Sequence, residues 1–496
     1  MEKRISDLVQ NIDVRANLSG LRQEIKENEN RIWLQNRIEE DVAFWTSFLS
    51  SDDAKTRKNI ALLLGDVKCQ KAMNQIFEAY NKETTLFVKS AYLTALLELE
   101  VESILPELKQ RMEELENEEI TEENRKHIEE EKRELRKILI RQEGIKKHKF
   151  SPRGKDVEAL LLVNRNQKET VKRTITCGKA KVHPLGVLVE TSDLPSLMQV
   201  RTYREMLFPI HTKGFISAKP EDAAKEIWDA DVWEILTKLH KESDPFYFRL
   251  ECKSPMTLEE RSKFSNKFCA SLERISEGKL INSTTDYEIE IRLIANKEGK
   301  FYPCLKLNTM RNQRFAYRKN AISASIHPST AALIMEIAES YLKEGAQIMD
   351  PFCGVGTMLI ERDKKVTARE IYATDIFGDA IEMGRENAKL AGTHINFIHR
   401  DFFDFKHAYK FDEIVTNMPV RGKKSKEEMN QLYAKFFDKA NEILTPDGVI
   451  IMYTNEMGLV KKYLRLHKEF SLLQETCMQT KTEFYLLILG KKGKVG

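Results

Sequence analysis

The sequence contains few cysteines, and their spacing excludes the usual cysteine-based sites. The seven cysteines among the 496 residues are odd in number, and no two are spaced as Cys-x-x-Cys. This pattern argues against a zinc site and favours a reducing compartment. An apolar run long enough to span a bilayer is lacking too, and the charged residues 1–7 do not resemble a signal peptide. We therefore expect a cytoplasmic protein that holds no metal and does not insert into a membrane.

Net charge is unevenly divided along the chain. Residues 1–140 carry 22 Lys and Arg against 29 Asp and Glu, whereas residues 141–496 carry 58 against 48. Basic surfaces attract phosphates and acidic surfaces repel them. Any nucleic acid is therefore expected on the later part of the chain and not along residues 1–140. The length itself predicts about three domains.

Residues 1–140 have the pattern of a repeated helical arm. Residues 56–67 align with residues 88–99 at an offset of 32, and amphipathic stretches at 72–80 and 104–112 follow the two copies. The pattern resembles HEAT-type repeats, in which helix pairs stack into an all-α solenoid that offers a surface to a protein partner. A plain helical bundle is the alternative. Residues 113–137 are dense in charge and predict one long solvated helix.

Residues 150–307 predict a mixed α/β domain. The expected strands are 157–163, 186–190, 245–251, 287–293 and 300–307, and the expected helices are 196–208, 220–239 and 258–275. This order resembles the THUMP fold, and the resemblance implies binding of structured RNA. A generic α/β adaptor is the alternative.

Residues 326–491 carry the most informative pattern, because polar residues follow four buried strands. Asp350 ends the first strand and is followed by a glycine turn, and Asp375, Asp401 and Asn417 follow the next three strands. The carboxyl ends of parallel strands meet at one edge of a doubly wound sheet, so these residues are expected to share a ligand site. Two last strands, 470–476 and 482–489, are so close in sequence that they must pair antiparallel.

This series resembles the class I S-adenosylmethionine (SAM) methyltransferases. The run Asp-Pro-Phe-Cys-Gly-Val-Gly-Thr at 350–357, with a later Asn-Met-Pro at 417–419, is similar to their RNA guanine-N2 branch, whose members carry a THUMP domain. The resemblance implies a Rossmann-like catalytic domain at 326–491 with SAM as its cofactor. The implied SAM-binding residues are Asp350, Pro351, Cys353, Gly354, Gly356, Thr357, Asp375, Ile376, Asp401, Phe402 and Asn417.

Each implied contact has a chemical reason. Glycines let the backbone approach the ligand, with Asp350 near its ammonium group. Asp375 can accept hydrogen bonds from both ribose hydroxyls, and Asp401 can accept from the adenine amino group, with Phe402 near the ring. An acid after the second strand would also be suitable for binding NAD. The Asn-Met-Pro turn, however, has no role in hydride transfer. Cys353 has no base at a usable place, which favours packing over a nucleophilic role.

The implied catalytic residues are Asn417, Met418 and Pro419. The Asn417 side-chain oxygen and the Met418 carbonyl can accept from the two N–H bonds of an aromatic amine, and the proline stiffens this geometry. An aromatic residue usually follows the proline in the resembled family and stacks on the base, whereas this chain has Val420. Stacking contributes ~1–3 kcal/mol per base, so this departure leaves the base and the activity open. An ordinary Asn-x-Pro strand end is the alternative.

Two basic segments are candidates for contact with RNA. The linker 308–325 contains Arg311, Arg314, Tyr317, Arg318 and Lys319, and a second cluster of Arg421, Lys423 and Lys424 follows the catalytic turn. Basic side chains pair with phosphates, and aromatic ones stack on unpaired bases. An ordinary solvated linker is the alternative for the first segment.

Together these features predict a SAM-dependent methyltransferase that acts on an exocyclic amine in structured RNA, guanine N2 of tRNA or rRNA. The resemblance supplies the RNA and the guanine. Chemistry alone equally fits DNA adenine-N6 methylation, although such enzymes are expected to carry a base-flipping recognition domain. A non-catalytic SAM-fold scaffold that recruits a partner through the helical arm is the alternative from another class.

Overall fold

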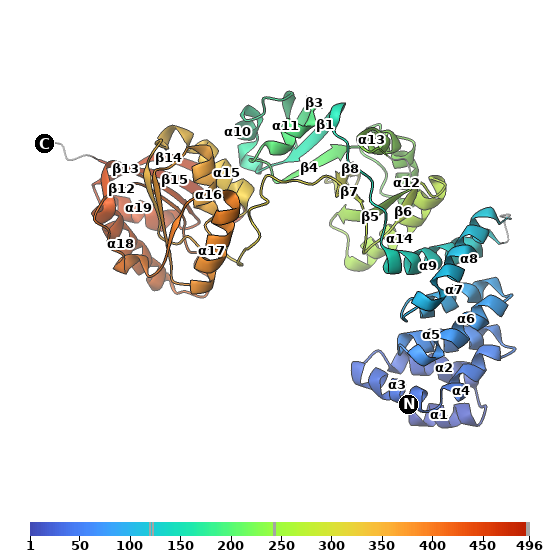
Figure 1. Cartoon of the computed structure of the whole chain (residues 1–496). Helices are drawn as coiled ribbons and strands as arrows, with labels where there is room; N and C mark the ends of the chain where they lie inside the picture. Colours follow the sequence, from blue (N-terminus) through green and yellow to red (C-terminus); the bar gives the residue numbers. More distant parts are fainter. Residues whose placement is uncertain (119–120, 122–123, 242–244, 493–496) are drawn as a thin grey trace. The chain divides into compact units, whose positions relative to one another are not determined.

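The computed structural model describes residues 1–118, 121, 124–241 and 245–492, and Figure 1 shows it as a ribbon. The chain divides into two compact units, Met1–Lys146 and Lys147–Gly496. The described part of the first unit contains helices but no strand, whereas the second unit holds two sheets. No helix in the described ranges is long and apolar enough to cross a membrane.

The first unit is built from helices that stack on one another along the chain. They are α1 (Glu2–Val9), α2 (Val14–Glu24), α3 (Asn28–Glu40), α4 (Val42–Ser47), α5 (Ala54–Asp66), α6 (Met73–Lys82), α7 (Leu86–Leu96), α8 (Leu105–Asn117) and α9 (Arg125–Glu143). Helix α5 packs on α2 and α7, and α7 packs on α9. A Cβ on Gly65 would lie only 2.6 Å from the Ala95 Cα, so α5 and α7 touch closely there. The expected helical arm is confirmed, and its HEAT-type character stays a prediction.

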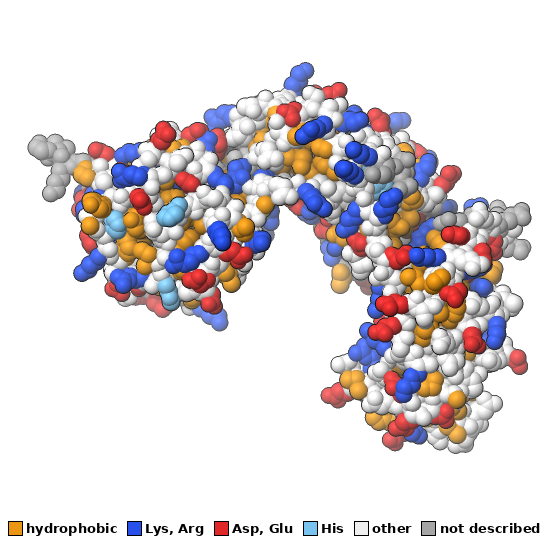
Figure 2. Space-filling view, in the orientation of Figure 1, with side chains coloured by type: hydrophobic (Ala, Val, Ile, Leu, Met, Phe, Trp, Pro, Cys, Tyr) orange, Lys and Arg blue, Asp and Glu red, His pale blue; other side chains and the backbone are white. Residues whose placement is uncertain are grey.

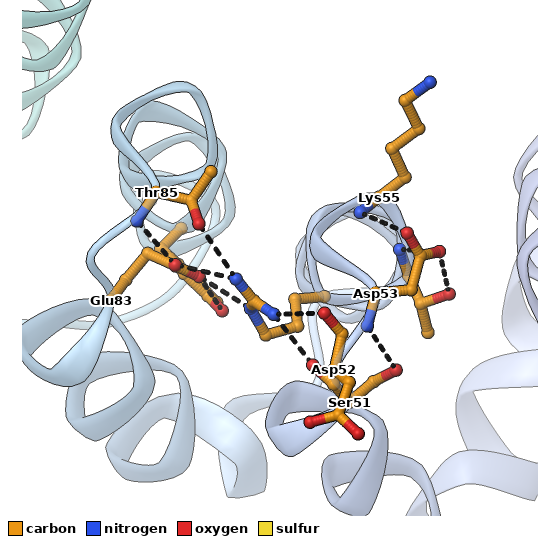
Figure 3. A network of polar contacts seen from close by, with 9 residues as sticks. Ser51, Asp52, Asp53, Lys55, Glu83 and Thr85 are labelled. Carbon is orange, nitrogen blue, oxygen red and sulfur yellow. Dashed lines mark hydrogen bonds and ion pairs between the residues drawn. The ribbon is translucent and has the colours of Figure 1, made fainter.

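A polar network ties the start of α5 to the loop before α7 (Figure 3). Arg57 donates two hydrogen bonds of 2.8 Å to the Glu83 carboxylate and one of 2.8 Å to the Ser51 carbonyl. Asp53 caps α5 by accepting from the Thr56 N–H at 3.1 Å. Burial alone would raise the pKa of Glu83, but the hydrogen bonds from Arg57 lower it to about 2. The pair therefore stays ionised at neutral pH and links two successive helix pairs.

The long solvated helix expected at 113–137 is corrected by the structure. Helix α8 ends at Asn117 and α9 begins at Arg125, and part of the stretch between them, 119–120 and 122–123, lies outside the described residues. Helix α9 is not solvated all round, because Ile128, Leu135 and Ile138 are buried against the other helices. These three apolar positions recur at helical spacing within a run that is otherwise charged.

The first sheet of the second unit is mixed. Its elements are β1 (Arg153–Leu162), α10 (Lys168–Arg173), β2 (Lys179–His183), β3 (Gly186–Asp193), α11 (Leu194–Gln199), β4 (Glu205–Pro209), α12 (Pro220–Trp228), α13 (Val232–Leu239), β5 (Phe246–Lys253), α14 (Leu258–Ile275), β6 (Leu280–Asn282), β7 (Ile289–Ala295) and β8 (Phe301–Leu307). The strand order is β2-β3-β1-β4-β8-β7-β5-β6. We refer to this part as the middle domain.

One expected helix of the middle domain is a strand instead. The helix expected at 196–208 ends at Gln199 as α11, and Glu205–Pro209 forms β4 in the interior of the sheet. Strand β4 pairs with β1 on one side and β8 on the other. A short apolar run in a sequence does not distinguish a strand from a helix. In this segment, pairing with two strands that are distant in sequence favours the strand.

The second sheet is the predicted parallel sheet with one reversed strand. Its elements are α15 (Pro328–Ile337), β9 (Gln347–Asp350), α16 (Thr357–Lys365), β10 (Glu370–Asp375), α17 (Gly378–Ala391), β11 (Asn396–His399), β12 (Phe411–Asn417), α18 (Lys426–Ile443), β13 (Leu444–Thr454), α19 (Met457–Leu466), β14 (Phe470–Gln479) and β15 (Phe484–Lys491). The order is β11-β10-β9-β12-β13-β15-β14, and only the pairings of β15 are antiparallel.

Both faces of this second sheet are covered by helices, as its apolar strands require. Side chains such as Ile348 and Val415 belong to one buried cluster, and Met349 and Ile414 belong to a cluster on the opposite face. Figure 1 shows α15, α16 and α17 on one side of the sheet and α18 and α19 on the other. The carboxyl ends of β9, β10, β11 and β12 are thereby left as the edge at which a ligand can enter.

Candidate functional site

Four predicted site residues come together at the carboxyl edge of the second sheet. Asp350, Asp375 and Asn417 are the last residues of β9, β10 and β12, and Asp401 follows β11 after Arg400. The four strands are consecutive neighbours in the order β11-β10-β9-β12, with β9, β10 and β11 in parallel register. The polar residues therefore line one continuous edge. We call this edge the candidate site.

The turn after β9 needs its glycines. Gly354 and Gly356 have φ angles of +49° and +77°, a region that side chains rarely adopt. A Cβ on Gly356 would also lie 2.9 Å from the Phe397 ring. The Gly354 N–H donates to the Asp375 carboxylate at 2.8 Å, and the Cys353 N–H donates to the Thr374 carbonyl at 3.0 Å. The glycine turn is thus fixed to the end of β10, with bare backbone facing the site.

Asp350 is a buried acid without a counter-charge. Its side chain is 1% exposed, and its carboxylate accepts from the Phe352 N–H at 3.0 Å. No Lys, Arg or His in the described ranges forms an ion pair with it. Burial, with a smaller contribution from Asp375, raises the pKa of Asp350 to about 7. A cationic group on a ligand would supply the missing charge, so the site fits the ammonium of an amino acid moiety.

Asp375 is held ready to accept hydrogen bonds. Its two carboxylate oxygens accept from the Gly354 N–H at 2.8 Å and the Phe377 N–H at 3.0 Å, which fixes its orientation. The next two side chains, Ile376 and Phe377, are large, apolar and exposed by 60% and 64%. Such an apolar pair beside a polar sheet edge suits the faces of an aromatic ring. Phe377 was missed from the sequence, because nothing in the local pattern distinguishes an exposed apolar residue from a buried one.

Near Asp401 the structure changes one assignment. Asp401 is exposed and accepts from the Phe403 N–H at 3.0 Å. Phe402, expected near the ligand ring, is 1% exposed and packs in the core between Phe352 and Phe436. A side chain with its ring in the core cannot reach a ligand. Phe403 is half-buried at the same turn and takes its place as the candidate.

The Asn417-Met418-Pro419 turn lies at the end of β12, with Asn417 and Pro419 half-buried. The Met418 N–H donates to the Tyr453 carbonyl at 2.9 Å, and its side chain is buried, so the turn is anchored to β13. The Asn417 side chain is half-buried, and none of the described residues makes a hydrogen bond with it. Val420 is 47% exposed. The geometry leaves the Asn417 amide open for a ligand.

The Cys353 thiol does not have the properties of a nucleophile. Burial raises the pKa of the Cys353 thiol well above its ordinary value, so it is not a nucleophile at neutral pH. In the described part of the chain no three His, Cys, Asp or Glu side chains are grouped to hold a metal ion. Pro351 and Thr357, the other predicted members, are buried at the two ends of the glycine turn.

The predicted RNA-contacting residues divide into exposed and buried ones. Arg421, Lys423 and Lys424 are exposed in the loop between β12 and α18, directly beside the candidate site. Arg311 and Lys319 are exposed as well, and Arg318 is half-buried. Lys and Arg side chains are also scattered over the middle-domain face seen in Figure 2, between apolar and other side chains. These positions remain available to phosphates.

Arg314 and Tyr317 have internal partners, which differs from the expectation that they face RNA. The Arg314 guanidinium lies 3.5 Å from the centroid of the Tyr203 ring and donates to the Val200 and Arg204 carbonyls. Burial lowers its pKa to about 10, so it remains charged. The Tyr317 hydroxyl donates to Glu361 at 2.6 Å. Both side chains are more than nine-tenths buried and serve the packing of the linker.

A separate cavity of about 720 Å³ opens in the middle domain, away from the candidate site. Its lining includes Glu158, Asp193 and Asp231, with His211 between two of these acids at 3.0 Å and 2.5 Å. Burial lowers the pKa of His211, but its hydrogen bonds to the accepting carboxylates of Asp231 and Glu158 raise that pKa above its ordinary value overall. Acids prevail in this lining, so the cavity does not suit phosphate.

Comparisons with known proteins agree with this geometry. Residues 316–483 match the family model described as RMKL-like, methyltransferase domain. Over 155 residues the chain is 30% identical to a tRNA (guanine(10)-N2)-dimethyltransferase of Methanothermobacter thermautotrophicus. That alignment covers 30% of this chain and 45% of the relative, so the chain spans less than half the length of this curated relative.

Solved structures share the fold of the second unit's sheets. TrmN from Thermus thermophilus is 18% identical with a TM-score of 0.50, and the match covers 67% of this chain and 99% of TrmN. SMU.472, solved in complex with S-adenosylhomocysteine (SAH), is 14% identical with a TM-score of 0.52, and the match covers 69% of this chain and all of SMU.472. About a third of the present chain therefore has no counterpart in them. The likeness shows the class I methyltransferase fold predicted from the sequence, the fold of SAM-dependent enzymes.

Proposed function

We propose that this chain is a SAM-dependent methyltransferase that methylates an exocyclic amine of a base in structured RNA, guanine N2 of tRNA or rRNA. The observation that carries the proposal is the edge formed by Asp350, Asp375, Asp401 and Asn417. A buried acid with no cationic partner among the described residues stands there beside a glycine turn and an open amide.

SAM, when bound, supplies a methyl group on a positively charged sulfur. The residues of this chain bind SAM and orient it. Asp350 pairs with the ammonium group, and Asp375, already fixed by two N–H donors, accepts from the ribose hydroxyls. Ile376, Phe377 and Phe403 would supply apolar contacts to the adenine.

Asn417 holds the amine that receives the methyl group. The Asn417 side-chain oxygen and the Met418 carbonyl accept from its two N–H bonds, so its lone pair points toward the methyl group. Rigid placement of these acceptors stabilises the positive charge that develops on nitrogen. Pro419 and the Met418–Tyr453 hydrogen bond keep the turn in place.

RNA as the substrate is supported by charge and by one relative. Arg421, Lys423 and Lys424 stand exposed beside the site, where they can bind phosphates. The M. thermautotrophicus relative acts on tRNA guanine, according to its name. DNA adenine-N6 methylation shares the Asn-x-Pro chemistry and is the second candidate. A non-catalytic scaffold is the third candidate, because this chain has Val420 at the position where an aromatic residue would stack on the base.

Methyl transfer from tritiated SAM separates these candidates. The purified chain is incubated with hypomodified total RNA and, in parallel, with unmethylated DNA, and acid-insoluble label is counted. We expect label in RNA only, and nucleoside analysis should then identify N2-methylguanosine. Label in DNA only would establish the adenine-N6 alternative. Label in neither, with SAM binding intact, would favour the scaffold.

The first unit and the cellular location complete the proposal. The acidic helical arm is proposed to bind a protein partner and not RNA, because its charge repels phosphate. All seven cysteines are free thiols, which fits a reducing cytoplasm. A pull-down with the helical arm, residues 1–140, fused to an affinity tag would test whether a protein partner binds. An equally acidic, unrelated protein on the same tag is the control.

A further inference from the structure

The linker between the two sheets of the second unit is fixed by an ion pair from the middle domain. Arg201 lies between α11 and β4, and its guanidinium donates to both carboxylate oxygens of Glu361 at 2.8 Å and 2.7 Å. Glu361 belongs to α16 and is 2% exposed. Paired, planar hydrogen bonds of this kind fix orientation as well as distance.

The linker itself takes part in this ion pair. The Tyr317 hydroxyl donates to the same Glu361 carboxylate at 2.6 Å, and Arg201 donates to the Arg314 carbonyl at 2.5 Å. The Arg201 guanidinium also lies 4.7 Å from the centroid of the Phe315 ring. Middle domain, linker and α16 therefore meet at one carboxylate.

The same linker continues to the glycine turn of the candidate site. The Asn320 N–H donates to the Asn387 side chain at 3.0 Å, and Asn387 donates back to the Asn320 carbonyl at 3.0 Å. Asn387 also donates to the Val355 carbonyl, inside the glycine turn, at 3.4 Å. Ile322 reaches within 3.8 Å of the place that a Cβ on Gly354 would occupy.

Glu361 is well placed to affect the glycine turn from its other side. Helix α16 begins at Thr357, directly after the turn, and Glu361 lies about one helical turn further along. A buried ion pair adds little stability compared with apolar packing of the same volume, because both charges lose water. Its geometric specificity is the property that apolar side chains would not reproduce.

We propose that Arg201, Glu361 and Tyr317 are positioning residues that hold the linker against the glycine turn, so that the middle domain completes the cofactor site. This inference rests on the proposed function. It assigns to the middle domain a second role besides contact with RNA. The cofactor is bound by residues of the second sheet, and their arrangement depends on an arginine from the first.

Calorimetric titration of the full chain with SAH tests the inference. Tyr317→Phe removes one hydroxyl and leaves the ion pair, and Glu361→Gln weakens both contacts. We expect each to weaken SAH binding about tenfold while the chain remains folded, as checked by thermal unfolding. The double variant should lose no more than Glu361→Gln alone, because both act through one carboxylate.

Arg292→Met is the matched control. Arg292 is buried and pairs with Glu205 and Glu290 within the middle domain, and it forms no ion pair with Glu361 among the described residues. We expect it to lower stability and to change SAH affinity less than twofold. Unaltered SAH binding by Tyr317→Phe and Glu361→Gln would overturn the positioning role. Losses that merely follow thermal stability, Arg292→Met included, would overturn it as well. Failure of the wild-type chain to bind SAH would instead contradict the proposed function.

Discussion

Two buried acids at opposite ends of the second sheet have opposite surroundings. Glu413, near the start of β12, is 0% exposed, and Arg362 donates to both of its oxygens at 2.7 Å. The Lys343 N–H donates to it at 2.8 Å. Asp350, at the end of β9, is 1% exposed and has no cationic partner within the described residues. At the amino end of the strands a basic side chain of the protein pairs with Glu413, whereas at the carboxyl end no described basic side chain pairs with Asp350.

This difference identifies the functional end of the sheet. An unpaired buried charge is costly, so a fold retains it only where a ligand or a reaction uses it. We therefore infer that the amino end is structural and that the carboxyl end is the proposed binding site. The following changes test that division, in order of decreasing effect.

Glu413→Gln should cause the largest loss, and the loss should be one of stability. Removing one charge of a buried pair leaves Arg362 uncompensated, which costs roughly 3–5 kcal/mol. Urea unfolding measures this change. The SAH affinity of the folded chain should remain within about twofold, because changes at distant sites act independently of one another. A weakened SAH affinity without loss of stability would contradict the division.

Asn417→Ala should abolish most of the turnover. Loss of one rigid acceptor at the developing charge lowers the rate by roughly 10²–10³-fold. SAH affinity should be retained, as calorimetry would show, since Asn417 acts on the amine. Asn441→Ala on α18 is the control and should leave methyl transfer unchanged. Equal rates for both variants would favour the scaffold.

Asp350→Asn should weaken SAH binding about tenfold by removing the charge that pairs with the ammonium, a loss of about 1.4 kcal/mol. Without ligand it should stabilise the chain. The pKa of Asp350 is raised to about 7 from 3.8, so its protonated form favours folding. That contribution is complete below about pH 4 and is lost as the pH rises through about 7.

Chemical unfolding at several pH values checks this sign. The stability of Asp350→Asn relative to wild type should increase from about pH 4 to about pH 8, because asparagine stays neutral. A difference that does not vary with pH would show that Asp350 is not protonated in the free chain. Glu413→Gln is the comparison, since its acid already has a permanent partner.

The double change Lys423→Glu and Lys424→Glu should have the smallest effect. It should weaken RNA binding and lower the slope of log affinity against log salt by roughly 1.5, about 0.7–0.9 for each phosphate contact. Filter binding at several salt concentrations measures the slope. Lys55→Glu with Lys82→Glu on the helical arm is the control, and an equal effect there would place the RNA elsewhere.

The sequence was sufficient for features that depend on local order. A buried strand followed by Asp350 and a glycine turn, and the Asn417-Met418-Pro419 turn after β12, are written in consecutive residues. The sheet edge follows from them, because parallel strands with helical connections have few arrangements. The reversed strand β15 follows from the short connection to β14.

The sequence was not sufficient where distant segments decide. Phe402 and Phe403 are identical side chains side by side, and only packing against Phe436 determines which one is buried. Arg314 in a basic run gives no sign of the Tyr203 ring that covers it. Arg201, which fixes the linker, lies in a loop without a motif, 160 residues from its partner.

Calorimetry of SAH binding in two buffers of different ionisation enthalpy tests the central claim most directly. At about pH 6.5 a carboxyl group with a pKa of about 7 is mostly protonated, and pairing with an ammonium group ionises it. We predict that the wild-type chain binds SAH and releases a large fraction of one proton, whereas Asp350→Asn binds more weakly and releases none. Absence of SAH binding, or the same proton release from both chains, would contradict the account.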